Sequence, residues 1–235
     1  MFLRCGAVLV LLSALGTGAV HAATNDDIWK LQMRRAMEAH RAGDLDAAAQ
    51  RLQQALTVAE MFEDPSEHLA ETLLAVSAVR FDGQDYAGAL APLQRAVTLL
   101  ERTASPDSTM LAGAHNALGL IHGRQGQPER AGPHYRRALA IYEQALGPDH
   151  PRVGSVEENL AGVALMAGRY EDAENGFARA LAIKEQAYGR ESPELIDTLR
   201  SYALVLSNLG REAEADELDA RANAINDRIG GSNSP

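Results

Sequence analysis

A 42-residue spacing of small residues constrains the fold of this chain more than any other feature of its sequence. Four alanines follow one another at this interval, Ala96, Ala138, Ala180 and Ala222. Self-similarity at such a period is the signature of a repeat protein, in which each unit is one supersecondary structure stacked on the next. Three further series keep the same step: Ala89, Ala131, Ala173 and Ala215; Ser77, Gly119, Ala161 and Ala203; and Gly126, Gly168 and Gly210, with Gly83 and Gly43 one and two residues off register.

Each unit has the pattern of two helices. In the fourth unit, apolar residues recur at helical spacing from Leu160 to Ala167, and Gly168 then supplies the backbone freedom that ends a helix. A second apolar helical pattern begins about two residues later, at Tyr170. The sequence therefore predicts an all-α solenoid of about five antiparallel helix pairs. The alanines are expected where two helices cross, since a methyl group lets backbones approach closely.

The spacing divides residues 23–230 into repeats at about 26–65, 66–107, 108–149, 150–191 and 192–229. Residues 231–235 have no apolar content and are predicted to form a flexible tail. Residues 1–22 have the layout of a secretory signal peptide, with Arg4, an apolar run, and small side chains at Val20 and Ala22. The alternative is a retained membrane anchor, but the run is shorter than the roughly 20 residues of a spanning helix.

Cleavage before Ala23 would leave an exported protein without cysteine, because Cys5 is the only cysteine of the chain. Disulfides and thiolate chemistry are then excluded from the mature protein. A cysteine-free exported protein fits the bacterial periplasm, and no membrane span is expected after cleavage.

Charge excludes one class of partner. The chain carries a formal net charge of -10, so nucleic acid is a poor partner. Residues 110–152 differ from the rest, with five basic and three acidic side chains, or +2. An acidic ligand would find a favourable field only there.

Two stretches carry a family resemblance. The run from Tyr135 to Leu146, continued by Gly147-Pro148-Asp149-His150-Pro151, resembles the 42-residue tetratricopeptide repeat of kinesin light chains and their bacterial relatives. The run from Asn159 to Ala161, followed by Gly168-Arg169-Tyr170-Glu171-Asp172-Ala173-Glu174, resembles the same repeat. The resemblance is strong over about 108–225 and weaker before it. Departures include Pro128, Glu212 and Asp219, where the family has aromatic residues.

The resemblance implies a right-handed superhelix whose first helices line a concave groove for an extended peptide or a partner's helix. Asparagine is useful in such a groove because its amide offers both a donor and an acceptor to a peptide backbone. Carried over position by position, the partner-binding residues would be Asn116, Leu120, Arg124, Glu158, Asn159, Met166, Arg200 and Asn208.

The sequence carries no pattern typical of a catalytic or metal-binding site. His115 and His122 are seven residues apart and could share a helix face, but no acidic residue stands at ligand spacing, so surface or groove positions are expected for them. The sequence has no phosphate loop, nucleophile elbow or dinucleotide fingerprint. We therefore expect neither an enzyme nor a cofactor.

These observations predict an exported scaffold or adaptor that binds another protein or a peptide, with an acidic ligand favoured at its middle. Two alternatives remain open. The same groove could bind a small ligand or a cell-wall fragment, which would require a deep pocket with convergent polar groups. The end repeats could instead support self-assembly, and the oligomeric state is left open.

Overall fold

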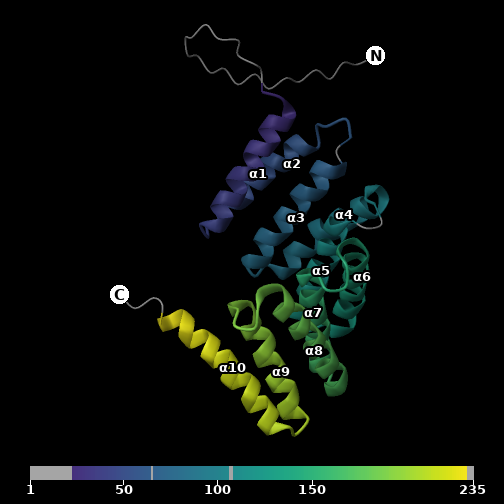
Figure 1. The fold of residues 1–235 in the computed structure, drawn as a ribbon. Helices are drawn as coiled ribbons and strands as arrows, with labels where there is room; N and C mark the ends of the chain where they lie inside the picture. The colour runs from purple at the N-terminus through teal and green to yellow at the C-terminus, as the bar shows by residue number, and fades with distance from the viewer. Residues whose placement is uncertain (1–22, 65, 106–107, 232–235) are drawn as a thin grey trace, which may run out of the picture.

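The computed structural model describes residues 23–64, 66–105 and 108–231, and helices account for most of these ranges (Figure 1). The predicted signal peptide, residues 1–22, and residues 232–235 of the predicted tail lie outside the described residues. No strand occurs in the described part of the chain, so the predicted all-α class is confirmed. The helices are α1 (Asn25–Arg41), α2 (Leu45–Ala59), α3 (Ser66–Asp82), α4 (Tyr86–Thr103), α5 (Thr109–Arg124), α6 (Pro128–Leu146), α7 (Pro151–Met166), α8 (Tyr170–Tyr188), the short 3₁₀ helix η1 (Pro193–Leu195), α9 (Ile196–Asn208) and α10 (Glu212–Gly231).

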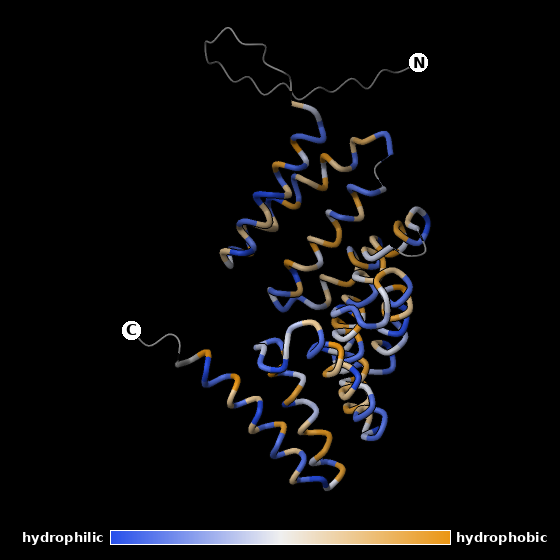
Figure 2. The backbone as a smooth tube through the Cα atoms, in the orientation of Figure 1, coloured by the Kyte–Doolittle hydropathy of each residue, from blue (hydrophilic) through white to orange (hydrophobic). Residues whose placement is uncertain are grey.

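Consecutive helices form pairs, and the pairs stack into an elongated array that runs from α1 to α10 (Figure 1). The second helix of each pair packs on the first helix of the next pair, and the first helices α5, α7 and α9 also touch in sequence. Hydrophobic and hydrophilic residues alternate along the helices in Figure 2, as expected of helices that bury one face. The array is the solenoid that the 42-residue spacing predicted.

The alanine series mark the tightest helix crossings. Ala55 and Ala48 extend the two alanine series backward with a step of 41. Nine of these ten alanines have no exposed surface, and the tenth, Ala215, is 2 % exposed. Methyl groups at these places let paired helices approach closely, so a longer side chain would overpack the contact. The nine are Ala48, Ala55, Ala89, Ala96, Ala131, Ala138, Ala173, Ala180 and Ala222.

The turn inside each pair requires one residue in the left-handed backbone region. Glycine fills this place in four repeats, at Gly43, Gly126, Gly168 and Gly210, with φ between 70° and 78°. In the second repeat Gln84 takes the position instead, with φ 61°, and Gly83 lies one residue too early. The off-register glycine of the sequence therefore leaves a non-glycine residue in a conformation that disfavours a Cβ.

A ladder of ion pairs joins successive second helices, and its arginines stand at the 42-residue spacing. On α6 the arginine of this series is Arg137, but the matching carboxylate on α4, Glu101, lies 3.8 Å from Nε2 of His115 instead. At the third repeat, Glu101 is therefore near a histidine of α5 and not paired with the arginine of α6. The pairs of the ladder are Arg95 with Glu60, at 3.5 Å between nitrogen and oxygen, Arg179 with Glu143, at 2.6 Å, and Arg221 with Glu185.

Candidate functional site

The residues predicted to line a groove lie on the first helices α5, α7 and α9, and on each helix most of them share a face. On α5, Asn116, Leu120 and Arg124 follow one another at four-residue steps, and on α7 Asn159 and Met166 are seven apart. The amide Nδ2 of Asn159 donates a hydrogen bond of 3.0 Å to Oδ1 of Asn116. This bond brings the predicted faces of α5 and α7 side by side.

The asparagine pair presents polar atoms that the fold does not use. Both side chains are half-buried, and each orients the other through the shared hydrogen bond. Neither Nδ2 of Asn116 nor Oδ1 of Asn159 has a hydrogen-bond partner within the described ranges. A donor and an acceptor are therefore held next to each other, which matches the carbonyl and amide groups of a peptide backbone.

Arg124 and Met166 add a cation and an apolar surface at the ends of α5 and α7. Arg124 is exposed and has no ion-pair partner in the part of the chain that the structure describes. Met166 is 55 % exposed and so offers apolar surface to solvent. Leu120, one turn before Arg124 on α5, is half-buried against the hydrophobic core.

Glu158 is also placed near the groove, but its carboxylate is bonded to other helices of the array. Oε2 accepts from Nζ of Lys184 at 2.5 Å, and Oε1 accepts from the Thr198 hydroxyl at 2.7 Å. The Thr198 hydroxyl in turn accepts from Nζ of Lys184 at 2.9 Å. Glu158 thus joins α7 to α8 and α9, and sequence spacing alone could not reveal these partners.

The two predicted residues on α9 are exposed and only weakly engaged. Arg200 donates to Oδ1 of Asn223 at 3.5 Å, and Asn208 donates to the backbone carbonyl of Leu204 at 2.7 Å. The second of these bonds lies within one helix turn and leaves the Asn208 carbonyl oxygen available. These two side chains therefore extend the polar surface toward the last repeat, without direct contact to the asparagine pair.

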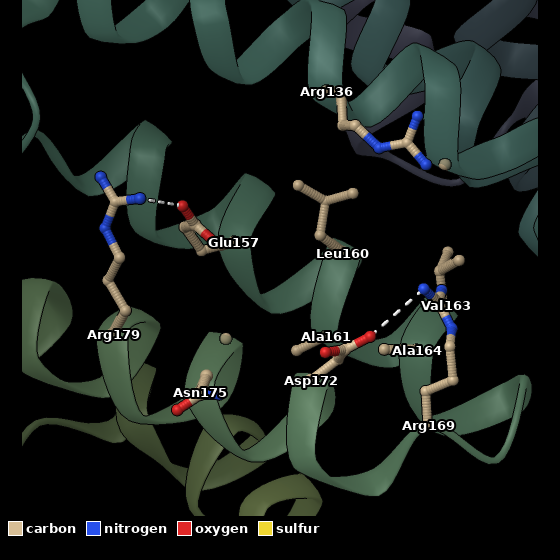
Figure 3. Close-up of a pocket in the computed structure, with 12 residues that line it drawn as sticks. Arg136, Glu157, Leu160, Ala161, Val163, Ala164, Arg169, Asp172, Asn175 and Arg179 are labelled. Atoms are coloured by element: carbon tan, nitrogen blue, oxygen red, sulfur yellow. Dashed lines mark hydrogen bonds and ion pairs between the residues drawn. The ribbon is translucent and has the colours of Figure 1, made fainter.

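A separate cavity of about 330 Å³ lies between α6, α7 and α8 (Figure 3). Of its α7 residues, Glu157 and Ala161 are on the side of the helix opposite Asn159 and Met166. Figure 3 shows Arg179 turned toward Glu157 and Arg169 toward Asp172, and both contacts are ion pairs. Burial raises the pKa of Glu157, and the charge of Arg179 opposes this shift. The polar groups of the cavity are largely paired with one another.

Three histidines fill the corresponding place in the third repeat. His115, His122 and His134 stand 42 residues before Glu157, Ala164 and Gly176. His115 and His122 are each only 6 % exposed, so the expectation of surface or groove histidines is wrong. Their face of α5 packs on α6, where the Nδ1 atoms of His115 and His134 are 3.3 Å apart and the ring of His134 stacks on that of His122. The described residues include no group of three or more side chains that could hold a metal ion.

Protonation of this cluster is expected to destabilise the protein. Burial lowers the pKa of both His115 and His134, and a neighbouring histidine lowers each pKa further. Arg137 adds to the lowering at His115, while Glu101 opposes the shift of both. A histidine with a lowered pKa in the folded state binds fewer protons when folded. Its contribution to stability is therefore complete above the unfolded-state pKa of about 6.5 and is lost as the pH falls toward the folded-state value.

We expect the melting temperature to fall between pH 7.5 and pH 5.5, and this fall to be smaller in His115→Leu. Leucine occupies the same register in two other repeats, at Leu73 and Leu199. The variant also removes Nε2 of His115, which is buried without a hydrogen-bond partner. Thermal unfolding followed by circular dichroism measures both curves. Equal pH dependence in the two proteins would contradict the role of the cluster.

The helix-pair solenoid defines the class of this protein, a repeat scaffold for protein interactions. A family model described as tetratricopeptide repeat matches residues 110–186 and 152–227. The chain therefore belongs to the tetratricopeptide repeat family, as the resemblance to kinesin light chain repeats predicted.

Solved structures share the fold at low sequence identity. BtubC (BKLC) from P. vanneervenii has 19 % identity and a TM-score of 0.73, with 91 % of this chain and 95 % of that chain covered. A putative kinesin light chain of Podospora anserina with nearly identical TPR-like repeats has 18 % identity, a TM-score of 0.74 and coverage of 89 % and 99 %. MamA from Desulfovibrio magneticus RS-1 has 15 % identity, a TM-score of 0.64 and coverage of 88 % and 98 %. The comparison with curated protein sequences gave no match.

Proposed function

We propose that this protein is an exported scaffold that holds an extended segment or a helix of a partner protein in the groove formed by α5, α7 and α9. The observation that carries this proposal is the bonded pair Asn116–Asn159, whose unused donor and acceptor share a helix face with an unpaired Arg124, two helix turns further along α5. The amides would bind the partner's backbone, and the guanidinium would pair with a carboxylate. The net charge of +2 over residues 110–152 supports an acidic partner segment.

The alternative of a small-ligand site is less well supported. The cavity of Figure 3 lies on the opposite side of α7, and the ion pairs of Arg169 and Arg179 already occupy most of its charged groups. A small ligand would have to compete with these contacts. Tetratricopeptide repeats are in general non-catalytic scaffolds, and we propose no reaction for this chain.

Self-assembly through the end repeats has one feature in its favour. Ile28 and Leu31 lie one turn apart on α1 and are 36 % and 38 % exposed. Two partly exposed side chains make a patch well below the several hundred Å² typical of an interaction surface. We therefore keep the groove as the proposed binding surface.

The double variant Arg124→Ala with Asn159→Ala is expected to lose partner capture strongly and to keep its melting temperature. The loss of one half-buried hydrogen bond is offset by the higher helix propensity of alanine, and each effect is on the order of 0.5–1 kcal/mol. Crosslinking and affinity capture from the native cell envelope, read by mass spectrometry, measures the effect.

The matched control is Arg136→Ala with Asn175→Ala, which removes the same two residue types from the cavity on the other side of α7. Both control residues are exposed. Capture should survive in this variant. Normal capture by the groove variant would exclude the groove and direct attention to the ends of the array.

Export is a further part of the proposal, and it predicts Ala23 as the first residue of the protein in its native host. The fold is compatible with this boundary, because Thr24 caps α1: its hydroxyl accepts from the Asp27 amide at 3.1 Å, and the Asp27 carboxylate accepts from the Thr24 amide at 3.0 Å. No described helix is long and apolar enough to cross a membrane. Mass spectrometry of the recovered protein identifies the N-terminus, and retention of residues 1–22 would favour the membrane anchor.

A further inference from the structure

One glycine of α7 has no structural explanation within the protein. Gly162 lies in the interior of the helix, where glycine is less favourable than alanine. A Cβ atom built at Gly162 would meet no atom within 4 Å. The other helix-interior glycines of the described ranges would each meet at least one atom within this distance; they are Gly88, Gly113, Gly119, Gly123, Gly132, Gly154 and Gly176. Close packing accounts for Gly88, Gly119, Gly154 and Gly176, where the nearest atom would be 2.0–3.1 Å from the added Cβ, whereas the space around Gly162 is open.

Gly162 lies on the groove side of α7. It follows Asn159 by three residues and precedes Met166 by four, so all three belong to one face. The positions 42 residues before and after it are Leu120 on α5 and Leu204 on α9. Leu120 is half-buried, and Leu204 is 55 % exposed. The missing side chain of Gly162 thus leaves open space on this face of α7, at the position that a leucine occupies in the repeats before and after it.

We propose that the open space at Gly162 receives a bulky apolar side chain of the partner segment. The proposal rests on the groove function above and adds an anchor to it. Leu204 and Met166 leave more than half of their surface exposed, and an apolar occupant would cover both. A glycine at the centre lets the partner's side chain and backbone approach the helix closely. Anchors of this kind, seated in a small pocket, carry much of the energy of an interface.

The positive charge of Arg124 indicates a second feature of the partner segment. Arg124 lies one turn beyond Leu120 on α5 and has no anionic partner in the described part of the chain. A carboxylate near the apolar residue of the partner would satisfy Arg124 while the backbone pairs with the Asn116–Asn159 amides. The partner segment is therefore one in which a large apolar residue stands close to an acidic residue.

A displayed library of random 16-residue peptides, selected on the purified protein, supplies a defined probe. One selected peptide is then synthesised with a fluorescent label, and its affinity is measured by fluorescence polarisation. For Gly162→Leu, which restores the leucine of the neighbouring repeats, we expect affinity to fall about tenfold or more. Gln144→Leu adds the same side chain at an exposed site on α6 and should leave affinity unchanged.

Gly162→Ala separates binding from folding. Because nothing opposes the added methyl group, the melting temperature should rise by about 2–4 °C through helix propensity alone, while peptide affinity falls. Exchange of the peptide's apolar residue for alanine should weaken binding to the natural protein and have little further effect on Gly162→Leu.

The outcomes distinguish the two proposals. If Arg124→Ala with Asn159→Ala abolishes peptide binding but Gly162→Leu and the peptide's apolar residue have no effect, the groove function stands and the anchor is wrong. If no peptide is enriched, or if binding survives the loss of Arg124 and Asn159, the groove function fails and the anchor fails with it. A selected motif built on small residues, with no large apolar position, would also overturn the anchor.

Discussion

Replacing Glu158 by alanine is expected to lower the free energy of unfolding by about 3 kcal/mol, because it leaves the ammonium group of Lys184 buried without a counter-charge. The side chain of Lys184 is 9 % exposed and that of Glu158 is 21 % exposed, so the pair is largely withdrawn from water. Breaking a buried ion pair on one side costs more than the pair itself contributes. Urea unfolding followed by circular dichroism measures the change.

Two further variants make this expectation specific. Lys184→Met added to Glu158→Ala removes the unpaired charge and should recover much of the lost stability. Asp172→Ala breaks an exposed ion pair with Arg169, of 3.3 Å, and should change stability by less than about 1 kcal/mol. Equal losses for Glu158→Ala and Asp172→Ala would show that Lys184 is not effectively buried. Because a Glu158 variant is expected to lose stability, a loss of partner binding by that variant would not test the groove.

The second large effect is expected where α7 and α8 cross. Ala180 has no exposed surface, and its carbonyl oxygen is 3.4 Å from where a Cβ of Gly154 would lie. Ala180→Leu adds three heavy atoms at this tight crossing and should cost about 1–3 kcal/mol, as should Ala138→Leu at the equivalent place. In a chain of this length, each 1 kcal/mol corresponds to a fall of about 2–4 °C in melting temperature.

The control for the added leucine is again Gln144→Leu, at an exposed position of α6. This change should be nearly neutral, since the new side chain points into solvent. If thermal unfolding gave the same shift for Ala180→Leu and Gln144→Leu, the alanine series would not mark the crossings.

The repeat spacing predicted the fold well because one physical requirement recurs in every unit. A small residue is needed wherever two helices cross, and a left-handed residue is needed wherever a pair turns, so alanine and glycine report the architecture directly. The prediction weakens where another residue satisfies the same requirement. Gln84 adopts the left-handed conformation in the second repeat, and the glycine pattern is off register there for that reason.

The sequence predicted which residues share the proposed groove face, but it did not predict which of their side chains bond to other helices. Helical spacing places Asn116 and Asn159 on neighbouring faces, and their hydrogen bond agrees with that placement. Spacing does not reveal which polar side chain is bonded to another helix, and Glu158 illustrates this limit. The histidines show the same difficulty: a separation of seven put His115 and His122 on one face, without indicating that this face packs on α6.

The arginines of the ion-pair ladder form a further regular series in the sequence. Arg95, Arg137, Arg179 and Arg221 stand 42 residues apart, and three of them form the ladder between second helices. Charged residues at repeat spacing are usually solvated, so spacing alone gives little reason to expect ion pairs. A glutamate series at the same step, Glu101, Glu143 and Glu185, was the signal that could have suggested them.

The neighbour-to-neighbour packing of the helix pairs also determines how the array responds to mechanical load. Each pair of described helices contacts only the pairs directly before and after it, so bending and twisting are shared among the joints between repeats. A small rotation at every joint widens or narrows the groove while each hairpin stays folded. When the two ends are pulled apart, we expect these joints to yield before the helix pairs, because the helices within a pair share more contacts than neighbouring pairs do. Joints in series act as springs in series, so the stiffness of such an array falls as repeats are added.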